Sequence, residues 1–259
     1  MKSAPAILSA AFFLIFLVSC GRPAASKKVL RLYAGAGLRR GVDAVIEAFT
    51  RETDIRVEPD YGGSGMIISR AREDRDADLF MPGDVWYVDR LNEKAGLVES
   101  KTDIAYFVPV IITSKGNPKQ INGLNDFFRE DVKPAVGNPD ACQIGRLTGR
   151  IFDKAGLDIS KLSAKKSLTV NELGVWVKMH DADAAIIWDA IAANISDSVD
   201  VVPIPERENI VSRVVIALMK TSGDKDSAGK FIDFIAHGKG RRILKHYGYR
   251  TTPPYSEGD

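Results

Sequence analysis

The sequence has few of the residues that build metal sites and disulfide frameworks. Its 259 residues include only 2 cysteines and 3 histidines, and His180, His237 and His246 show no His-x-x-x-His or His-Glu pairing. A disulfide framework and a Cys-rich zinc site are therefore ruled out, and a metallohydrolase has little support. We expect no cofactor, no metal ion and no intrachain disulfide.

An excess of charge of one sign is also missing. The 36 Lys and Arg residues against 34 Asp and Glu residues leave a formal net charge of +2, which argues against a nucleic-acid-binding surface or an acidic tail. With 45% hydrophobic and 27% charged residues, the composition predicts a soluble globular protein. The length allows one large domain or two lobes of roughly 100 residues each.

The amino terminus carries a short targeting pattern. Lys2 is followed by an apolar run over residues 10–18, which is too short for a permanent membrane span. The string Leu-Val-Ser-Cys ending at Cys20 resembles a bacterial lipobox, whose cysteine becomes the lipid-modified first residue of the mature protein. We expect residues 1–19 to be a signal peptide and 20–28 a tether, with the mature chain lipid-anchored in the periplasm or on the outer face of the cell membrane. The alternative is a plain signal peptide that happens to contain a cysteine.

From residue 29 on, short β-branched runs alternate with longer segments of helical period, which predicts βα units and a largely parallel sheet. The expected strands are Val29–Ala34, Ile55–Tyr61, Asp78–Met81, Ala135–Val136, Ser167–Val170, Ala184–Trp188 and Val199–Ile204. The expected helices are Leu38–Thr53, Ser64–Asp76, Val85–Ala95, Ile144–Ala155, Ser227–Ala236 and Gly240–His246.

Two apolar runs are suited to connect separate lobes. Ile104–Thr113 has no helical partner nearby and is expected to cross from one lobe to the other, and Val211–Met219 to cross back. We therefore expect an α/β protein with two lobes around a ligand cleft. Lobe I would hold residues 29–106 and 213–259, and lobe II residues 107–212.

Three loops rich in glycine or small residues lie between a strand and the start of a helix, at 34–38, 61–65 and 137–142. The first turn of a helix has unpaired N–H groups and the positive end of the helix dipole, so such loops can bind anions without a charged side chain. The simpler interpretation is a tight turn. A dinucleotide fingerprint fails because Arg40 stands where its third glycine belongs, and the loop around Ser64 lacks the second glycine of a nucleophile elbow.

In their order along the chain, these segments resemble the molybdate-binding family of periplasmic solute-binding proteins of ABC importers. The resemblance covers nearly the whole mature chain and is carried by the segments 30–38, 61–65, 77–80, 85–87, 96–98, 137–139, 184–188 and 247–249. It implies a class II periplasmic binding protein fold, a tetrahedral dianion held by hydroxyl and backbone N–H groups in the cleft, and a permease partner in the inner membrane.

The resemblance also implies the ligand-binding positions. It places Gly37 where the family usually has a Ser and Trp188 where it has a Tyr, so that only Ser64 keeps a side-chain hydroxyl. The indole N–H of Trp188 is a possible replacement donor. It also places Ala141 near the ligand and Val170 near a backbone donor before a helix. With neighbouring residues of the same segments, the candidate ligand-binding set is Ala36, Gly37, Leu38, Gly63, Ser64, Ala141, Cys142, Val170, Trp188 and Asp189.

Some neighbouring residues have two interpretations. Arg39 and Arg40 are either solvated on the first helical turn or bring charge to the cleft. Cys142 is either a small buried residue or a soft, redox-sensitive ligand contact. A carboxylate at Asp140 or Asp189 would repel a bare dianion.

Three functions are therefore compared. The first is a monomeric, non-enzymatic binding protein for molybdate or tungstate. The second keeps the fold and binds a small phosphorylated or carboxylated organic anion. The third is a secreted hydrolase with Ser64 as nucleophile, and it requires a histidine within hydrogen-bond reach of that hydroxyl.

Overall fold

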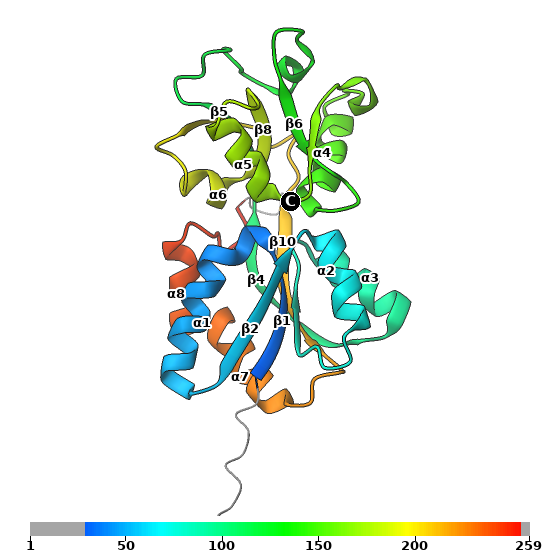
Figure 1. Ribbon diagram of the computed structural model, residues 1–259, viewed down its shortest axis with the longest axis vertical. Helices are drawn as coiled ribbons and strands as arrows, with labels where there is room; N and C mark the ends of the chain where they lie inside the picture. Colours follow the sequence, from blue (N-terminus) through cyan, green and yellow to red (C-terminus); the bar gives the residue numbers. More distant parts are fainter. Residues whose placement is uncertain (1–28, 255–259) are drawn as a thin grey trace, which may run out of the picture.

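The computed structural model describes residues 29–254. The predicted signal peptide 1–19, lipidation at Cys20 and tether 20–28 lie outside these residues. The described chain forms two lobes, each built on a five-stranded sheet with helices packed on it (Figure 1). Within this part of the chain, no helix combines the length and hydrophobicity needed to cross a membrane.

The first lobe holds the sheet with strand order β2-β1-β3-β10-β4. Its strands are β1 (Val29–Gly35), β2 (Arg56–Gly62), β3 (Leu79–Met81), β4 (Val98–Phe107) and β10 (Ser212–Met219). Strands β1, β2 and β3 are parallel, while β10 runs antiparallel to both of its neighbours.

Both faces of this sheet are covered. Alternate residues of a strand point to opposite faces, and along β10 Val214 and Ile216 join one hydrophobic cluster while Val215 and Ala217 join another. The first cluster lies under α1, α7 and α8 and the second under α2 and α3 (Figure 1). These helices are α1 (Arg39–Thr53), α2 (Ser64–Glu73), α3 (Val85–Ala95), α7 (Lys225–Ala236) and α8 (Gly238–His246).

The second lobe holds the sheet with strand order β7-β6-β8-β5-β9. Its strands are β5 (Pro109–Ser114), β6 (Pro134–Gly137), β7 (Lys165–Ser167), β8 (Ala184–Trp188) and β9 (Val199–Pro203). Its helices are α4 (Gln143–Lys154), α5 (Val170–Lys178) and α6 (Asp189–Ala193). Short 3-10 helices are η1 (Ala36–Leu38) in the first lobe and η2 (Leu124–Phe128) and η3 (Ile159–Lys161) in the second.

The chain crosses between the lobes twice, from β4 to β5 through Val108 and from β9 back to β10. The predicted strand over Ile104–Thr113 is thus wrong as a single element, because it divides at Val108 into strands of different sheets. The crossing strands also make both sheets mixed, so the expected largely parallel sheet is wrong. The predicted lobe limits stay a prediction.

The local pattern predicted most elements, and β8 and α3 have the expected bounds. The strand expected over Ser167–Val170 is wrong, since β7 ends at Ser167 and Val170 begins α5. The cause is a side-chain N-cap at Thr169 that the β-branched residues obscured. The Thr169 hydroxyl accepts the Glu172 amide at 3.4 Å, and the Glu172 carboxylate accepts the Leu168 amide at 2.8 Å.

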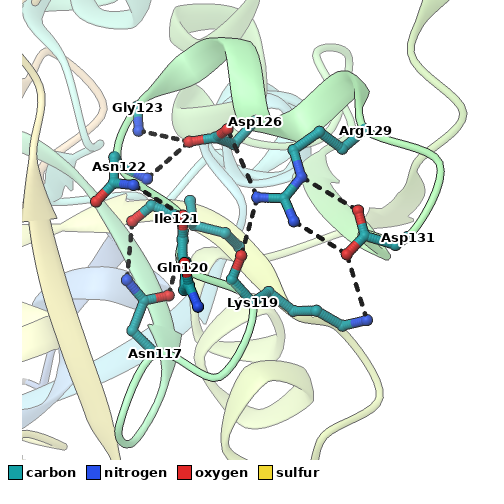
Figure 2. A network of polar contacts seen from close by, with 9 residues as sticks. All are labelled: Asn117, Lys119, Gln120, Ile121, Asn122, Gly123, Asp126, Arg129 and Asp131. Atoms are coloured by element: carbon teal, nitrogen blue, oxygen red, sulfur yellow. Dashed lines mark hydrogen bonds and ion pairs between the residues drawn. The ribbon is translucent and has the colours of Figure 1, made fainter.

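A polar network fixes the long connection from β5 to β6, at the end of β6 opposite the lobe boundary (Figure 2). One Asp126 oxygen accepts the amides of Asn122 at 2.7 Å and Gly123 at 3.2 Å. Arg129 binds both oxygens of Asp131. These bonds act together with packing on the second lobe, where the Phe127 ring contacts the Phe152 ring of α4.

Candidate functional site

A narrow cavity lies between the two lobes, where strand-to-helix loops of both lobes meet. The first lobe contributes the loops after β1 and β2, the turn after β3 and the end of β4, and the second contributes the starts of α4 and α5 and the end of β8. The lining residues are Gly35, Ala36, Gly37, Gly62, Gly63, Ser64, Gly83, Phe107, Cys142, Gln143, Ile144, Val170 and Trp188.

Most of the predicted site residues come together here. Those that line the cavity are Ala36, Gly37, Gly63, Ser64, Cys142, Val170 and Trp188. Leu38 does not line it and is fully buried in the hydrophobic core. The Ala141 carbonyl accepts the Gly65 amide at 3.0 Å, and the Asp189 carboxylate binds the Arg250 side chain at 2.6 Å.

The lining residues that the sequence prediction missed are Gly35, Gly62, Gly83, Phe107, Gln143 and Ile144. Gln143 and Ile144 directly follow the predicted loop as the first residues of α4, so helix N-terminal position was a usable signal for them. Gly83 and Phe107 had no such local signal.

Ser64 is the one residue with a side-chain hydroxyl among the described residues of the cavity lining. The residue is 3% exposed and begins α2, and its Oγ accepts the Gly83 amide at 2.9 Å. Because that contact uses an oxygen lone pair, the hydroxyl hydrogen stays available as a donor. The bond also ties the turn after β3 to the start of α2.

The cavity wall presents donors and no formal charge. The helices α2, α4 and α5 all begin at it, with Ser64, Gln143 and Val170 as their first residues. Backbone N–H groups of a first helical turn have no partner within the helix, and the helix dipole makes this end positive. No Asp, Glu, Lys, Arg or His is among the described residues of the lining. Such a wall can hold an acceptor-rich anion without repelling it.

Gly37 and Trp188 fit together as a pair. A Cβ at Gly37 would lie 3.0 Å from Trp188 Cδ1 and 3.2 Å from its Nε1, so the indole occupies the space that a side chain at 37 would need. The indole stacks on Phe107, with ring centroids 4.8 Å apart and planes at 9°. The Tyr249 hydroxyl donates to the Gly37 carbonyl at 2.9 Å, and burial keeps that hydroxyl protonated by raising its pKa to about 12.

Two glycines let the lobes meet next to the cavity. A Cβ at Gly63 would lie 2.6 Å from the Leu168 carbonyl oxygen, and one at Gly65 would overlap the Asp140 carbonyl oxygen. Both obstacles are backbone atoms of the second lobe, which no rotamer change can move. The bare backbone of this loop therefore allows the cleft to close to the observed width.

A buried polar network joins the lobes beside the same cavity. Gln143 Nε2 donates to Ser212 Oγ at 3.0 Å, and this hydroxyl donates to Asp84 Oδ2 at 2.7 Å. Arg146 donates from Nε to Gln143 Oε1 at 3.1 Å, and its guanidinium lies 4.3 Å from the centre of the Trp86 ring. The network links a lining residue of the second lobe to the first lobe.

Cys142 is a buried neutral thiol. It is the N-cap residue of α4, and burial raises the pKa of its side chain to about 11. Its Sγ lies 3.6 Å from the Asn138 carbonyl oxygen. Of the two interpretations given above, this environment favours the small buried residue over a reactive thiolate.

Arg39 and Arg40 stay out of the cavity lining. The Arg39 guanidinium lies 4.3 Å from the centre of the Tyr61 ring, and Arg40 Nη1 donates to the Asn194 carbonyl at 3.4 Å. Both line a neighbouring groove instead.

The geometry gives no support to a serine hydrolase. No histidine of the described chain lines the cavity, and the Ser64 hydroxyl accepts a hydrogen bond from the Gly83 amide. His180 Nδ1 contacts Ser114 Oγ at 3.0 Å, in a different part of the second lobe. A base within reach of Ser64, which that mechanism needs, is not found among residues 29–254.

Curated relatives share most of the chain's length. A binding protein of Haemophilus influenzae is 29% identical over 223 residues, with 85% of this chain and 90% of the relative covered. The molybdate-binding protein ModA of Mycobacterium tuberculosis is 25% identical over 252 residues, with 93% of this chain and 95% of the relative covered.

Solved structures share the fold. The sulfate-binding protein SubI of Mycobacterium tuberculosis has a TM-score of 0.77 at 20% identity, with 87% of this chain and 88% of that chain covered. L-phospholactate-bound PEB3, a protein of Campylobacter jejuni, has a TM-score of 0.68 at 18% identity, with 85% and 99% covered.

The family model of the bacterial extracellular solute-binding proteins matches residues 30–250, which include the whole cavity lining and both sheets except for Val29. The relatives are binding proteins, and the two-lobed α/β architecture with a cavity at the lobe boundary agrees with that match. The chain belongs to the family of bacterial extracellular solute-binding proteins and has the class II periplasmic binding protein fold.

Proposed function

We propose that this protein is a non-enzymatic solute-binding component of an ABC importer whose ligand presents a tetrahedral oxyanion group to the cavity between the lobes. The observation that supports this best is the uncharged donor lining, in which helix N-termini, the Ser64 hydroxyl and the Trp188 indole meet without a carboxylate. A fully ionised oxyanion offers only acceptors, so neutral donors suit it.

The residues proposed to contact this group are Ala36, Gly37, Gly63, Ser64, Cys142, Val170 and Trp188. Selectivity would come from cavity size and donor placement, and release from opening of the lobes about the two crossing segments when a membrane permease is engaged. No bond is made or broken in this cycle.

Two ligand classes fit the cavity. Molybdate or tungstate is the first, and the likeness to ModA supports it. A small organic anion is the second. It is favoured by Gly37 and Trp188, which replace hydroxyl side chains of the molybdate-binding family, and by a cationic groove next to the cavity. PEB3, with its bound phospholactate, shows that the fold accommodates such an anion.

A thermal-shift panel tests the proposal. Molybdate, tungstate, sulfate, phosphate and L-phospholactate are added separately to the purified protein. A ligand at 100 times its Kd adds about 2.7 kcal/mol, which raises the Tm of a protein of this size by about 5–10 °C. At least one tetrahedral anion should produce such a shift, and a panel without any shift would reject the function.

The amino-terminal predictions belong to the same proposal. We propose that Cys20 is lipidated and that the mature monomer is tethered at the outer face of the membrane. Mass spectrometry of the mature amino terminus checks this. A diacylglyceryl mass on Cys20 is expected, and an unmodified first residue contradicts it.

A further inference from the structure

A second space adjoins the cavity on one side of the lobe boundary. This side groove has a volume of about 250 Å³ and shares Ala36 and Gly37 with the cavity wall. It lies between the start of α1 in the first lobe and α5 and α6 in the second, helices that face each other across the boundary in Figure 1. The two spaces share a wall at Ala36 and Gly37, where Asn171 Nδ2 donates to the Ala36 carbonyl at 3.2 Å across the lobe boundary.

The wall of the side groove is mostly apolar. Val175 on α5, Ile191 on α6 and Ile195 just after it contribute hydrocarbon surface. Val175 is 55% exposed, which is high for a branched aliphatic residue, and no described element covers this side chain. A hydrocarbon segment of a ligand that covered Val175 would stabilise the complex, because apolar surface would be removed from water.

The rim of the same groove is cationic. Arg39, Arg40 and Lys178 line it, and no Asp or Glu of the described chain does. None of the three cations forms an ion pair with a described carboxylate. Arg39 rests on the Tyr61 ring, and Arg40 has only a long hydrogen bond, 3.4 Å, to the Asn194 carbonyl. The charge of the groove is therefore complementary to a second anionic group.

We propose that the solute is an organic anion with two anionic groups that fills both spaces. The tetrahedral group lies in the cavity, a short hydrocarbon linker lies against Val175 and Ile195, and a carboxylate lies among Arg39, Arg40 and Lys178. This inference rests on the proposed function, because it needs the first anionic group to be held at Ser64.

A homologous series of probes tests it by isothermal titration calorimetry on the full chain. Methylphosphonate carries the tetrahedral group alone, while phosphonoacetate, 3-phosphonopropionate and 4-phosphonobutyrate add a carboxylate on linkers of increasing length. The best phosphonocarboxylate should bind at least tenfold more tightly than methylphosphonate, since each buried methylene contributes about fourfold in affinity before the second ion pair is counted.

Substitutions at two exposed positions of α5 test whether the side groove contributes to phosphonocarboxylate affinity. Val175→Glu and Lys178→Glu each place negative charge in the side groove without touching the cavity lining. Both variants should weaken binding of the tightest phosphonocarboxylate at least tenfold and change the affinity for methylphosphonate less than threefold. Lys133→Glu is the matched control, because Lys133 is an exposed cation of the second lobe at the far end of β6, and it should change neither.

The outcomes separate the two proposals. If methylphosphonate binds as tightly as every phosphonocarboxylate, or if Val175→Glu and Lys178→Glu leave all affinities unchanged, the second anionic group is refuted while the oxyanion site stands. If no probe of this series and no inorganic oxyanion binds, the proposed function fails and this inference fails with it.

Discussion

Replacing Ser64 by alanine perturbs the donor set of the cavity at one atom. The hydroxyl is buried, accepts the Gly83 amide at 2.9 Å and lines the cavity. A hydrogen bond to a charged group contributes about 1.5–3 kcal/mol, so Ser64→Ala should weaken binding of a tetrahedral anion by about 10- to 150-fold. Loss of the Gly83 contact should also lower the free energy of unfolding by about 1 kcal/mol.

Two assays separate these effects. Calorimetric titration with the anion that gives the largest thermal shift measures the affinity, and urea unfolding without ligand measures the stability. Ser167→Ala is the matched control, since Ser167 is 1% exposed, its Oγ has no hydrogen-bond partner and it lies outside the cavity lining. This control should change affinity less than twofold.

The reasoning is refuted if Ser64→Ala binds the anion within twofold of the natural protein. It is also refuted if Ser64→Ala and Ser167→Ala weaken binding equally, because the loss would then reflect a general effect on the fold rather than the removed donor.

Three further experiments, two with substitutions and one by chemical labelling, test other parts of the site. Gly65→Ala should hold the lobes apart, because its Cβ would overlap the Asp140 carbonyl; with saturating anion, small-angle scattering should show a larger radius of gyration than for the natural protein, and an unchanged radius would contradict the close contact. Gly37→Ala should displace the Trp188 indole, whose N–H is a proposed donor, and weaken anion binding at least fivefold; an unchanged affinity would exclude the coupling between the two residues. Burial raises the pKa of Cys142 to about 11, so its thiol should react with iodoacetamide at pH 8 about 100-fold more slowly than a free thiol of pKa 9.0. Bound anion should slow this reaction further. The folded state should also lose stability between about pH 9 and pH 11, because the thiol of the unfolded chain ionises first. Mass spectrometry of the Cys142 peptide gives the rate, and rapid labelling would disprove the burial.

The sequence pattern predicted the strands, loops and helices whose formation depends on residues close together in the chain. Strand, glycine loop and helix follow one another around Gly37 and Ser64, so periodicity and loop composition were sufficient to expect an anion site there. The β-branched neighbours of Val170 favoured a strand, although Thr169 followed three residues later by Glu172 is a sequence pattern typical of a helix start.

Contacts between distant residues were not predictable in the same way. Gln143 and Asp84 meet through Ser212, and the two bonds span 69 and 128 residues of sequence. Asp189 follows a residue of the cavity wall but turns its carboxylate to Arg250, because the strand ends there and a helix begins. Sequence adjacency does not fix side-chain direction at such a junction. The side groove likewise exists only because the two lobes face each other.

The most direct test of the donor cavity is an amide NMR titration with the tetrahedral anion that gives the largest thermal shift. The largest chemical-shift changes are predicted for the backbone N–H groups of Gly37, Ser64, Gln143 and Val170 and for the indole N–H of Trp188. Saturable binding that leaves these five resonances in place and moves signals elsewhere would show that the anion binds outside the cavity, and would contradict the central claim.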